Sequence, residues 1–406
     1  MDTPVSIEDA PLIEDTPVSA IGGFEDWPGF IRSSAGFAGH SPASAGLAGL
    51  LGVPALSPEA PKVTVRSVRV VDGVRISELR WQLPFGPATT GYLAVPATTP
   101  ATPPAGLPGL LWLHCHAGNK WLGSERVVDL GPDNLPEAAT LREDLYAGVA
   151  PVNELAKAGF AVLTHDAFSW GSRRFSLTPP PPRTAAVLAG RRAAWAAEGI
   201  TPTPAMLYNA AAADHENTVA KAAGMLGTSY AGMVAFEDLT ALQILRTLPG
   251  VDAARIGTGG FSGGGGRALM LSALDPGIQA CVVACMMTTI KALFPAHLDF
   301  HSWLMNTPGL AAAVDWPELA ALAPATRFLV QYASRDRLFP LAGMQDADAA
   351  LLRILAEPGR YSSQWHPAGH VFDRELLSRA RDHFLSVLPP AAAPESERET
   401  AFSHRL

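Results

Sequence analysis

The sequence has little charge, few basic residues and no long hydrophobic run, and each scarcity excludes a class of protein. Charged residues make up 17% of the 406 residues, and the formal net charge is −8. No basic cluster offsets that charge, so we expect neither nucleic acid nor an anionic membrane as a partner. The longest apolar runs, such as residues 278–287, are much shorter than a membrane-spanning helix.

Cysteines are also too sparse for a disulfide framework. The chain has three, at Cys115, Cys281 and Cys285. The last two fall in residues 279–285, a segment that predicts a buried strand with small core side chains. The N-terminus is acidic, contains prolines and lacks the basic start and apolar stretch of a secretory signal. We therefore expect a cytoplasmic protein, and whether a leader was removed or a homo-oligomer forms stays open.

What is abundant is hydrophobic sequence, at 48% of the residues, arranged mainly in the middle of the chain. Residues 1–60 are rich in Ala, Gly, Pro and Ser without sustained periodicity, and they predict an irregular N-terminal extension. Residues 389–406 have the composition of a disordered tail. A single folded domain is therefore expected over residues 61–388, and it is long enough for a sizeable core.

The periodicity of that domain predicts an α/β fold with helices on both faces of a mostly parallel sheet. Alternating apolar and polar residues predict three antiparallel strands at 62–71, 74–83 and 89–97, with a turn at Asp72-Gly73. Continuous apolar runs predict buried parallel strands at 110–115, 160–166, 279–285 and 326–334. Helices are expected at 141–158, 234–248 and 374–388.

One long segment interrupts this alternation of strands and helices. Residues 171–232 contain a run of prolines followed by alanine-rich, helix-forming sequence. An insertion of this length between two strands of one sheet is typical of a cap or wall over a site. We call this segment the cap.

The most unusual stretch is Gly259–Gly266, where six of eight residues are glycine. A Walker loop would require Lys-Ser/Thr where Gly266-Arg267 stands, and a dinucleotide loop would require glycine where Ser262 stands. A flexible linker is excluded because the glycines join a strand to a helix. The spacing Gly260-Phe261-Ser262-Gly263-Gly264 is G-x-S-x-G between strand and helix, which predicts a nucleophile elbow around Ser262.

An elbow serine needs an acid and a base that follow it in the chain. Asp336 comes directly after the strand at 326–334, and Asp346 and Asp348 are poorer candidates because they fall on a helical stretch. For the base we favour His370, on a loop before the last helix, over His366, at the end of the last strand. His370 would take the serine proton and Asp336 would fix the tautomer of its ring.

Two backbone amides are expected to stabilise the oxyanion: that of Gly263, after the nucleophile, and that of His116, in the loop after the strand at 110–115. Ala117 is an alternative to His116. His114 and His116 alternate onto one face of the chain and raise a metal interpretation. No third ligand is suitably spaced, so neither a metal nor a cofactor is expected.

With these residues in place, the chain resembles the α/β-hydrolase superfamily, and specifically its dienelactone hydrolase and acetyl xylan esterase-like branch. The resemblance covers residues 105–385 and is carried by "LHCHAG", "VDAARIGTGGFSGG", "ASRDRLFP" and "GHVF". It implies a triad of Ser262, Asp336 and His370, with His116 and Gly263 as oxyanion donors. The chain departs from dienelactone hydrolases in having serine rather than cysteine as nucleophile.

These observations predict a serine carboxylic-ester hydrolase that acts through an acyl-enzyme on small or short-acyl esters, such as acetyl esters, or on aromatic esters. Two alternatives stay open: an amidase or peptidase on the same scaffold, and a ligand-binding protein without catalysis. A small-molecule ester is the expected partner.

Overall fold

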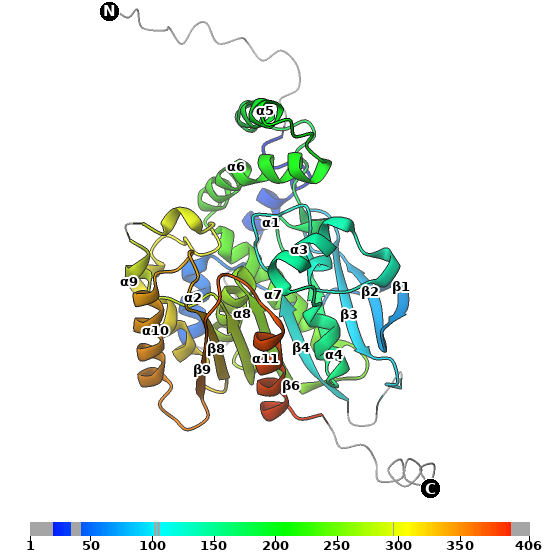
Figure 1. The fold of residues 1–406 in the computed structure, drawn as a ribbon, viewed down its shortest axis with the longest axis vertical. Coiled ribbons are helices and arrows are strands. Elements are labelled where there is room, and N and C mark those ends of the chain that lie inside the picture. The colour runs from blue at the N-terminus through cyan, green and yellow to red at the C-terminus, as the bar shows by residue number, and fades with distance from the viewer. Residues whose placement is uncertain (1–18, 34–41, 101–102, 104–105, 295, 391–406) are drawn as a thin grey trace, which may run out of the picture.

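The computed structural model describes residues 19–33, 42–100, 103, 106–294 and 296–390. Its centre is a nine-stranded sheet in the order β1-β2-β3-β5-β4-β6-β7-β8-β9 (Figure 1). The strands are β1 (Thr64–Val71), β2 (Val74–Trp81), β3 (Thr89–Pro96), β4 (Leu107–Leu113), β5 (Ala161–His165), β6 (Val251–Phe261), β7 (Ala280–Ala284), β8 (Arg327–Ala333) and β9 (Tyr361–His366).

The sheet is antiparallel at one edge and parallel elsewhere, which confirms the mixed sheet predicted. β1, β2 and β3 pair antiparallel, and the strands from β5 to β9 run parallel. Asp72 and Gly73 form the first turn, both with positive φ. β5 and β7 are buried at every position because helices cover both faces, whereas β1 is largely exposed along its length.

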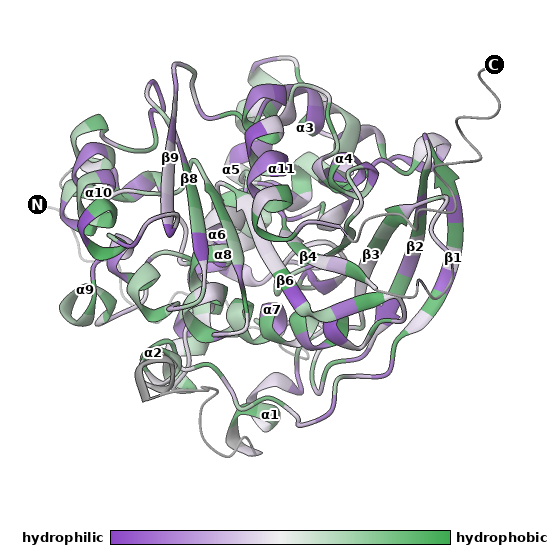
Figure 2. Ribbon diagram, turned by 90° about the horizontal axis from the view of Figure 1, so that it is seen from below, coloured by the Kyte–Doolittle hydropathy of each residue, from purple (hydrophilic) through white to green (hydrophobic). Residues whose placement is uncertain are grey.

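Helices pack on both faces of this sheet (Figures 1 and 2). α7 and α8 contact β6 and β4 on one face, and α4 and α11 cover the other. The helices are α1 (Trp27–Ser33), α2 (Pro42–Leu51), α3 (Pro136–Tyr146), α4 (Pro151–Lys157), α5 (Pro182–Ala197), α6 (Pro204–Met225), α7 (Tyr230–Thr247), α8 (Gly263–Leu274), α9 (Leu310–Ala313), α10 (Leu341–Ile354) and α11 (Arg374–Val387). Among the described residues, none of them is long and apolar enough to cross a bilayer.

Two sequence predictions differ from this structure. The helix expected at 141–158 is two helices, α3 and α4, because Ala147 and Gly148 take left-handed φ angles of 50° and 72° that end the first one. The extension at 1–60 was expected to be irregular, but it contains α1 and α2. α2 is rich in alanine and glycine, so it lacks the strong apolar stripe by which a sequence reveals a helix.

The described part of that extension packs against the domain. Phe24 and Trp27 are fully buried and form ring contacts with Phe168 and Phe175. Leu51 is buried in the same core. The disordered tail predicted at 389–406 falls mostly outside the described residues.

The segment that we call the cap contains α5 and α6. α5 starts at Pro182, a residue suited to the first helical turn, and Thr203 caps α6 by accepting a hydrogen bond from the Met206 amide. The two helices contact each other, and α6 contacts α7. In Figure 1 they project beyond the end of the sheet.

Candidate active site

Ser262 sits at the sharp turn between β6 and α8. Its backbone angles are φ 56° and ψ −129°, a strained conformation for a residue with a side chain. Its amide donates to the Ala284 carbonyl of β7 at 2.8 Å, and its carbonyl accepts from the Gly266 amide at 3.1 Å. These two bonds fix the turn to the neighbouring strand and to the first turn of the helix.

Close backbone contacts explain the glycines next to Ser262. A Cβ on Gly264 would lie 2.0 Å from the Leu113 carbonyl oxygen, and one on Gly260 would lie 2.5 Å from that same oxygen. No real Cβ tolerates such distances. The crowding of β4, β6 and α8 therefore requires glycine at both positions.

The next two glycines of α8, Gly265 and Gly266, differ in what surrounds them, and only Gly265 lies against neighbouring backbone. A Cβ on Gly265 would meet backbone atoms of Gly260 and Ala284 at 3.0–3.1 Å. A Cβ on Gly266 would instead meet side-chain atoms of Met286 and Trp316 at 3.1 Å. The first position faces backbone, whereas the second faces two side chains.

The structure brings Ser262, His370 and Asp336 into one chain of hydrogen bonds. His370 Nε2 lies 2.8 Å from Ser262 Oγ, and His370 Nδ1 lies 2.6 Å from Asp336 Oδ2. A carboxylate only accepts, so Nδ1 carries the ring hydrogen and Nε2 is left to accept the hydroxyl proton. This is the arrangement in which a serine hydroxyl can become a nucleophile.

Both partners of Ser262 are themselves held in place. Asp336 is 7% exposed, and its second oxygen accepts from the Leu338 amide at 2.9 Å. The His370 ring packs on Phe261, with ring centroids 4.7 Å apart. His366 ends β9, where its Nε2 contacts Asp373 at 2.8 Å, so its ring is engaged away from the serine.

The backbone nitrogen of His116 lies close to Gly263, the residue that follows Ser262. A Cβ on Gly263 would be 3.1 Å from the His116 nitrogen, so the loop after β4 touches the first turn of α8. The N-terminus of that helix carries partial positive charge. The loop, residues 114–120, is here called the oxyanion turn. It contains Ala117 and Gly118, with φ of 52° and 59°.

His114 and His116 have separate surroundings despite their alternation in sequence. His114 is buried, its Nδ1 bonds to the Cys115 carbonyl, and burial lowers the pKa of its ring well below the usual value. The three cysteines are buried free thiols. Within the part of the chain that the structure describes, no group of three or more His, Cys, Asp or Glu side chains is arranged to hold a metal.

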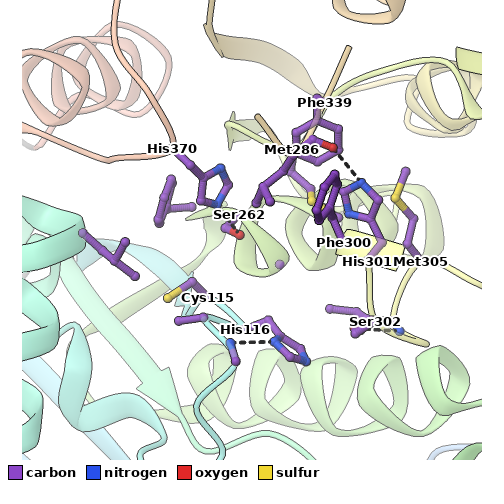
Figure 3. Close-up of a pocket in the computed structure, with 17 residues that line it drawn as sticks. Cys115, His116, Ser262, Met286, Phe300, His301, Ser302, Met305, Phe339 and His370 are labelled. Carbon is purple, nitrogen blue, oxygen red and sulfur yellow. Dashed lines mark hydrogen bonds between the residues drawn. The ribbon is translucent and has the colours of Figure 1, made fainter. Parts of the chain in front are cut away.

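A cavity of about 310 Å³ opens in front of Ser262 (Figure 3). Its walls are mainly apolar, and one side is formed by the segment 300–305 that follows β7. In Figure 3, His370 points at Ser262, while Phe300, His301 and Met305 lie across the cavity. The residues lining it include Cys115, His116, Leu145, Phe261, Met286, Leu304, Leu338 and Phe339.

His301 is a polar residue of this cavity that the sequence did not single out. Its Nε2 bonds to the Leu338 carbonyl at 3.1 Å, and its ring lies on Phe339 with centroids 4.7 Å apart. Burial lowers the pKa of His301, which favours the neutral ring. It lies in a segment without periodicity, so no sequence signal marks it.

A buried ion pair between the oxyanion turn and the cap was also not identified from the sequence. Glu216 of α6 and Lys120 of the oxyanion turn are 6% and 4% exposed, and their charged atoms are 2.5 Å apart. Burial alone would raise the pKa of Glu216, but Lys120 and His116 outweigh it and hold that pKa well below its usual value. The partners are 96 residues apart in the sequence (216 − 120), so no local pattern could reveal the pair.

Comparison with known proteins supports this picture of the fold. No family model matches the chain. "Putative hydrolase YtaP" of Bacillus subtilis (strain 168) is 25% identical over 282 residues, which cover 68% of this chain and 77% of that protein. Among solved structures, a "putative acetyl xylan esterase" from Bacteroides fragilis NCTC 9343 aligns with TM-score 0.55, 15% identity and coverage of 84% and 81% of the two chains.

A glucuronoyl esterase from Solibacter usitatus aligns with TM-score 0.51 and 14% identity, covering 89% of this chain and 91% of that one. At such identities the structural likeness speaks for the fold alone. Together with the elbow and the sheet order, these findings show that the chain has the α/β-hydrolase fold, with a "putative acetyl xylan esterase" among its structural neighbours.

Proposed function

We propose that the protein is a serine carboxylic-ester hydrolase that acts through an acyl-enzyme. The observation that carries this proposal is the hydrogen-bond chain from Asp336 through His370 to Ser262. Ser262 Oγ attacks the ester carbonyl while His370 Nε2 takes its proton, and the protonated ring then donates to the departing alcohol. Water hydrolyses the acyl-enzyme with His370 again as base.

The amides of His116 and Gly263 are the oxyanion donors in this proposal. They come from two separate elements that meet beside the serine, and the N-terminus of α8 adds its dipole. Losing one such donor typically costs about 10²–10³ in kcat. The same geometry serves the formation and the hydrolysis of the acyl-enzyme.

Small or short-acyl esters, of the acetyl type, or aromatic esters are the proposed substrates. A cavity of about 310 Å³ limits the group that can enter, and Met286, Leu304 and Met305 give it apolar walls. The esterase names of structural neighbours support carboxylic esters as the class. A series of p-nitrophenyl esters from acetate to octanoate should show kcat/KM falling as the acyl chain lengthens.

The decisive test is Ser262→Ala on p-nitrophenyl acetate. We expect kcat to fall by at least about 10⁴, because the nucleophile is lost while the oxyanion donors stay. Ser272→Ala is the matched control: it is a buried serine of the same helix, outside the cavity lining, whose hydroxyl donates to the Ala268 carbonyl. Substantial turnover by Ser262→Ala, or an equal loss in Ser272→Ala, would exclude the assignment.

A further inference from the structure

A buried charged cluster lies directly behind the oxyanion turn and has no part in the triad. Glu216 Oε2 is 2.5 Å from Lys120 Nζ and 3.2 Å from His116 Nε2. Lys120 Nζ also donates to the Tyr230 hydroxyl at 2.8 Å and lies 4.9 Å from the ring centroids of Tyr230 and Trp170. Burying two charges is costly, and apolar residues often pack as well in their place. A role beyond packing is therefore worth seeking.

The tautomer of His116 shows which way the hydrogen bond to Glu216 runs. The Gly118 amide donates to His116 Nδ1 at 2.9 Å, and an amide can only donate. The ring hydrogen is therefore on Nε2, which donates to the Glu216 carboxylate. Trp170 closes a third side of the ring, with centroids 5.2 Å apart and planes at 81°. The side chain of His116 is thus fixed in position and orientation.

That side chain belongs to the residue whose backbone amide is one of the two proposed oxyanion donors. The turn after it is strained at Ala117, whose φ is left-handed, and the Asn119 amide closes it onto the His116 carbonyl at 3.1 Å. Alanine is disfavoured there because its Cβ crowds the following carbonyl oxygen. An external hold on the ring opposes relaxation of this turn, and relaxation would rotate the His116 amide away.

The second oxygen of the same carboxylate reaches the far wall of the cavity. Glu216 Oε1 accepts from the Trp303 amide at 3.0 Å, in the segment that places Phe300 and Met305 around the substrate space. One carboxylate, supplied by helix α6 of the cap, therefore joins the oxyanion turn to the cavity wall.

We propose that Glu216 is a positioning residue, which holds the His116 amide in its oxyanion-binding orientation through the His116 ring, with Lys120 as its countercharge. This rests on the proposed esterase function. The cap then does more than cover the site, because it carries a group on which the geometry of the reaction depends. Glu216 touches neither the serine nor His370 among its described contacts, so its proposed effect on the oxyanion runs through the His116 ring.

The first test is Glu216→Gln, measured on p-nitrophenyl acetate. We expect kcat to fall about 10–100-fold with KM changed less than about threefold, because oxyanion stabilisation acts mainly in the transition state. The control is Glu237→Gln, which disrupts the equally buried Glu237–Arg173 pair outside the cavity lining. It should lower thermal stability and leave kcat unchanged. Equal losses of kcat in both variants, or a loss confined to KM, would overturn the proposal.

A double-mutant cycle with His116→Ala separates positioning from stability. His116→Ala keeps the backbone amide but removes the ring through which Glu216 acts. The two single variants should each lose kcat, and the double variant should be no worse than the poorer single variant. Multiplicative losses would contradict action through His116.

The double variant Glu216→Leu/Lys120→Met provides a test in case Glu216→Gln alone fails to fold. Removing both charges avoids leaving one buried and unpaired, so this variant should recover stability while kcat stays low. Recovery of full kcat would show that the pair serves packing alone. A failed esterase assignment gives a different result, namely turnover that persists in Ser262→Ala.

Discussion

Ser262 in the nucleophile elbow and Ala117 in the oxyanion turn both have left-handed φ, of 56° and 52°, but they are held there differently. The elbow is held by backbone: β4, β6 and α8 approach so closely that Gly260 and Gly264 leave no room for a Cβ. The oxyanion turn is held by side chains: buried Arg126 donates to the His116 and Asn119 carbonyls, and Glu216 on the cap accepts from the His116 ring. One half of the site is therefore built into the sheet, and the other half depends on side chains, one of which comes from an insertion.

The largest effect should follow from breaking the elbow with Gly264→Ala. The new Cβ would lie 2.0 Å from the Leu113 carbonyl oxygen, and neither β4 nor α8 can move without unpacking the sheet. We expect a loss of more than about 4 kcal/mol in the free energy of unfolding, together with the loss of esterase activity. Urea unfolding followed by circular dichroism measures the first. A stable, active variant would contradict the steric account.

The oxyanion turn should be sensitive to acid in a way that the elbow is not. The pKa of Glu216 is held below its usual value of 4.5, so its pairing contributes stability above about pH 4.5 and loses it as the pH falls further. At pH 7, Glu216→Gln should be less stable than the unaltered protein by about 3–5 kcal/mol. This difference should narrow when urea unfolding is repeated between pH 5 and pH 3. If the difference in free energy of unfolding between the two proteins stayed constant over this pH range, Lys120 and His116 would not be stabilising the ionised carboxylate of Glu216.

A pair of neighbouring substitutions measures how far the backbone crowding extends along α8. Gly265→Ala should cost about 1–3 kcal/mol because its Cβ meets the backbone of Gly260 and Ala284. Gly266→Ala should cost less, within about 1 kcal/mol of neutral, since its Cβ meets the side chains of Met286 and Trp316 rather than backbone and alanine favours the helix. Thermal unfolding of the two variants side by side gives the comparison. If Gly266→Ala lost more stability than Gly265→Ala, the tighter crowding would be at Gly266, and this account would be wrong.

The smallest effect is expected for Ala117→Gly. Glycine removes the left-handed penalty but makes the unfolded chain more flexible, so the free energy of unfolding should change by less than about 1 kcal/mol. If the His116 ring and Glu216 hold the turn, kcat should stay within about twofold. A much larger fall in kcat would show that residue 117 itself fixes the amide.

This contrast also explains what the sequence could predict. The elbow, the sheet and the order of Ser262, Asp336 and His370 follow from local spacing, because glycine sterics and strand patterns act over a few residues. The arrangement of Glu216, Lys120 and His116 could not be predicted, since its members meet only after α6 has folded back. The break between α3 and α4 was missed for a related reason: Ala147 adopts a conformation that alanine rarely takes.

The bond from the Ser262 amide to Ala284 extends the pairing of β6 and β7 to the nucleophile itself. Hydrogen exchange at this amide requires the central strands to separate, so its rate should approach that of global opening. Glu216 does not tie the oxyanion turn to the sheet in this way, because Glu216 belongs to α6 of the cap. On warming, the cap should therefore loosen first. Activity should be lost at that stage, while Ser262 is still held in its native position.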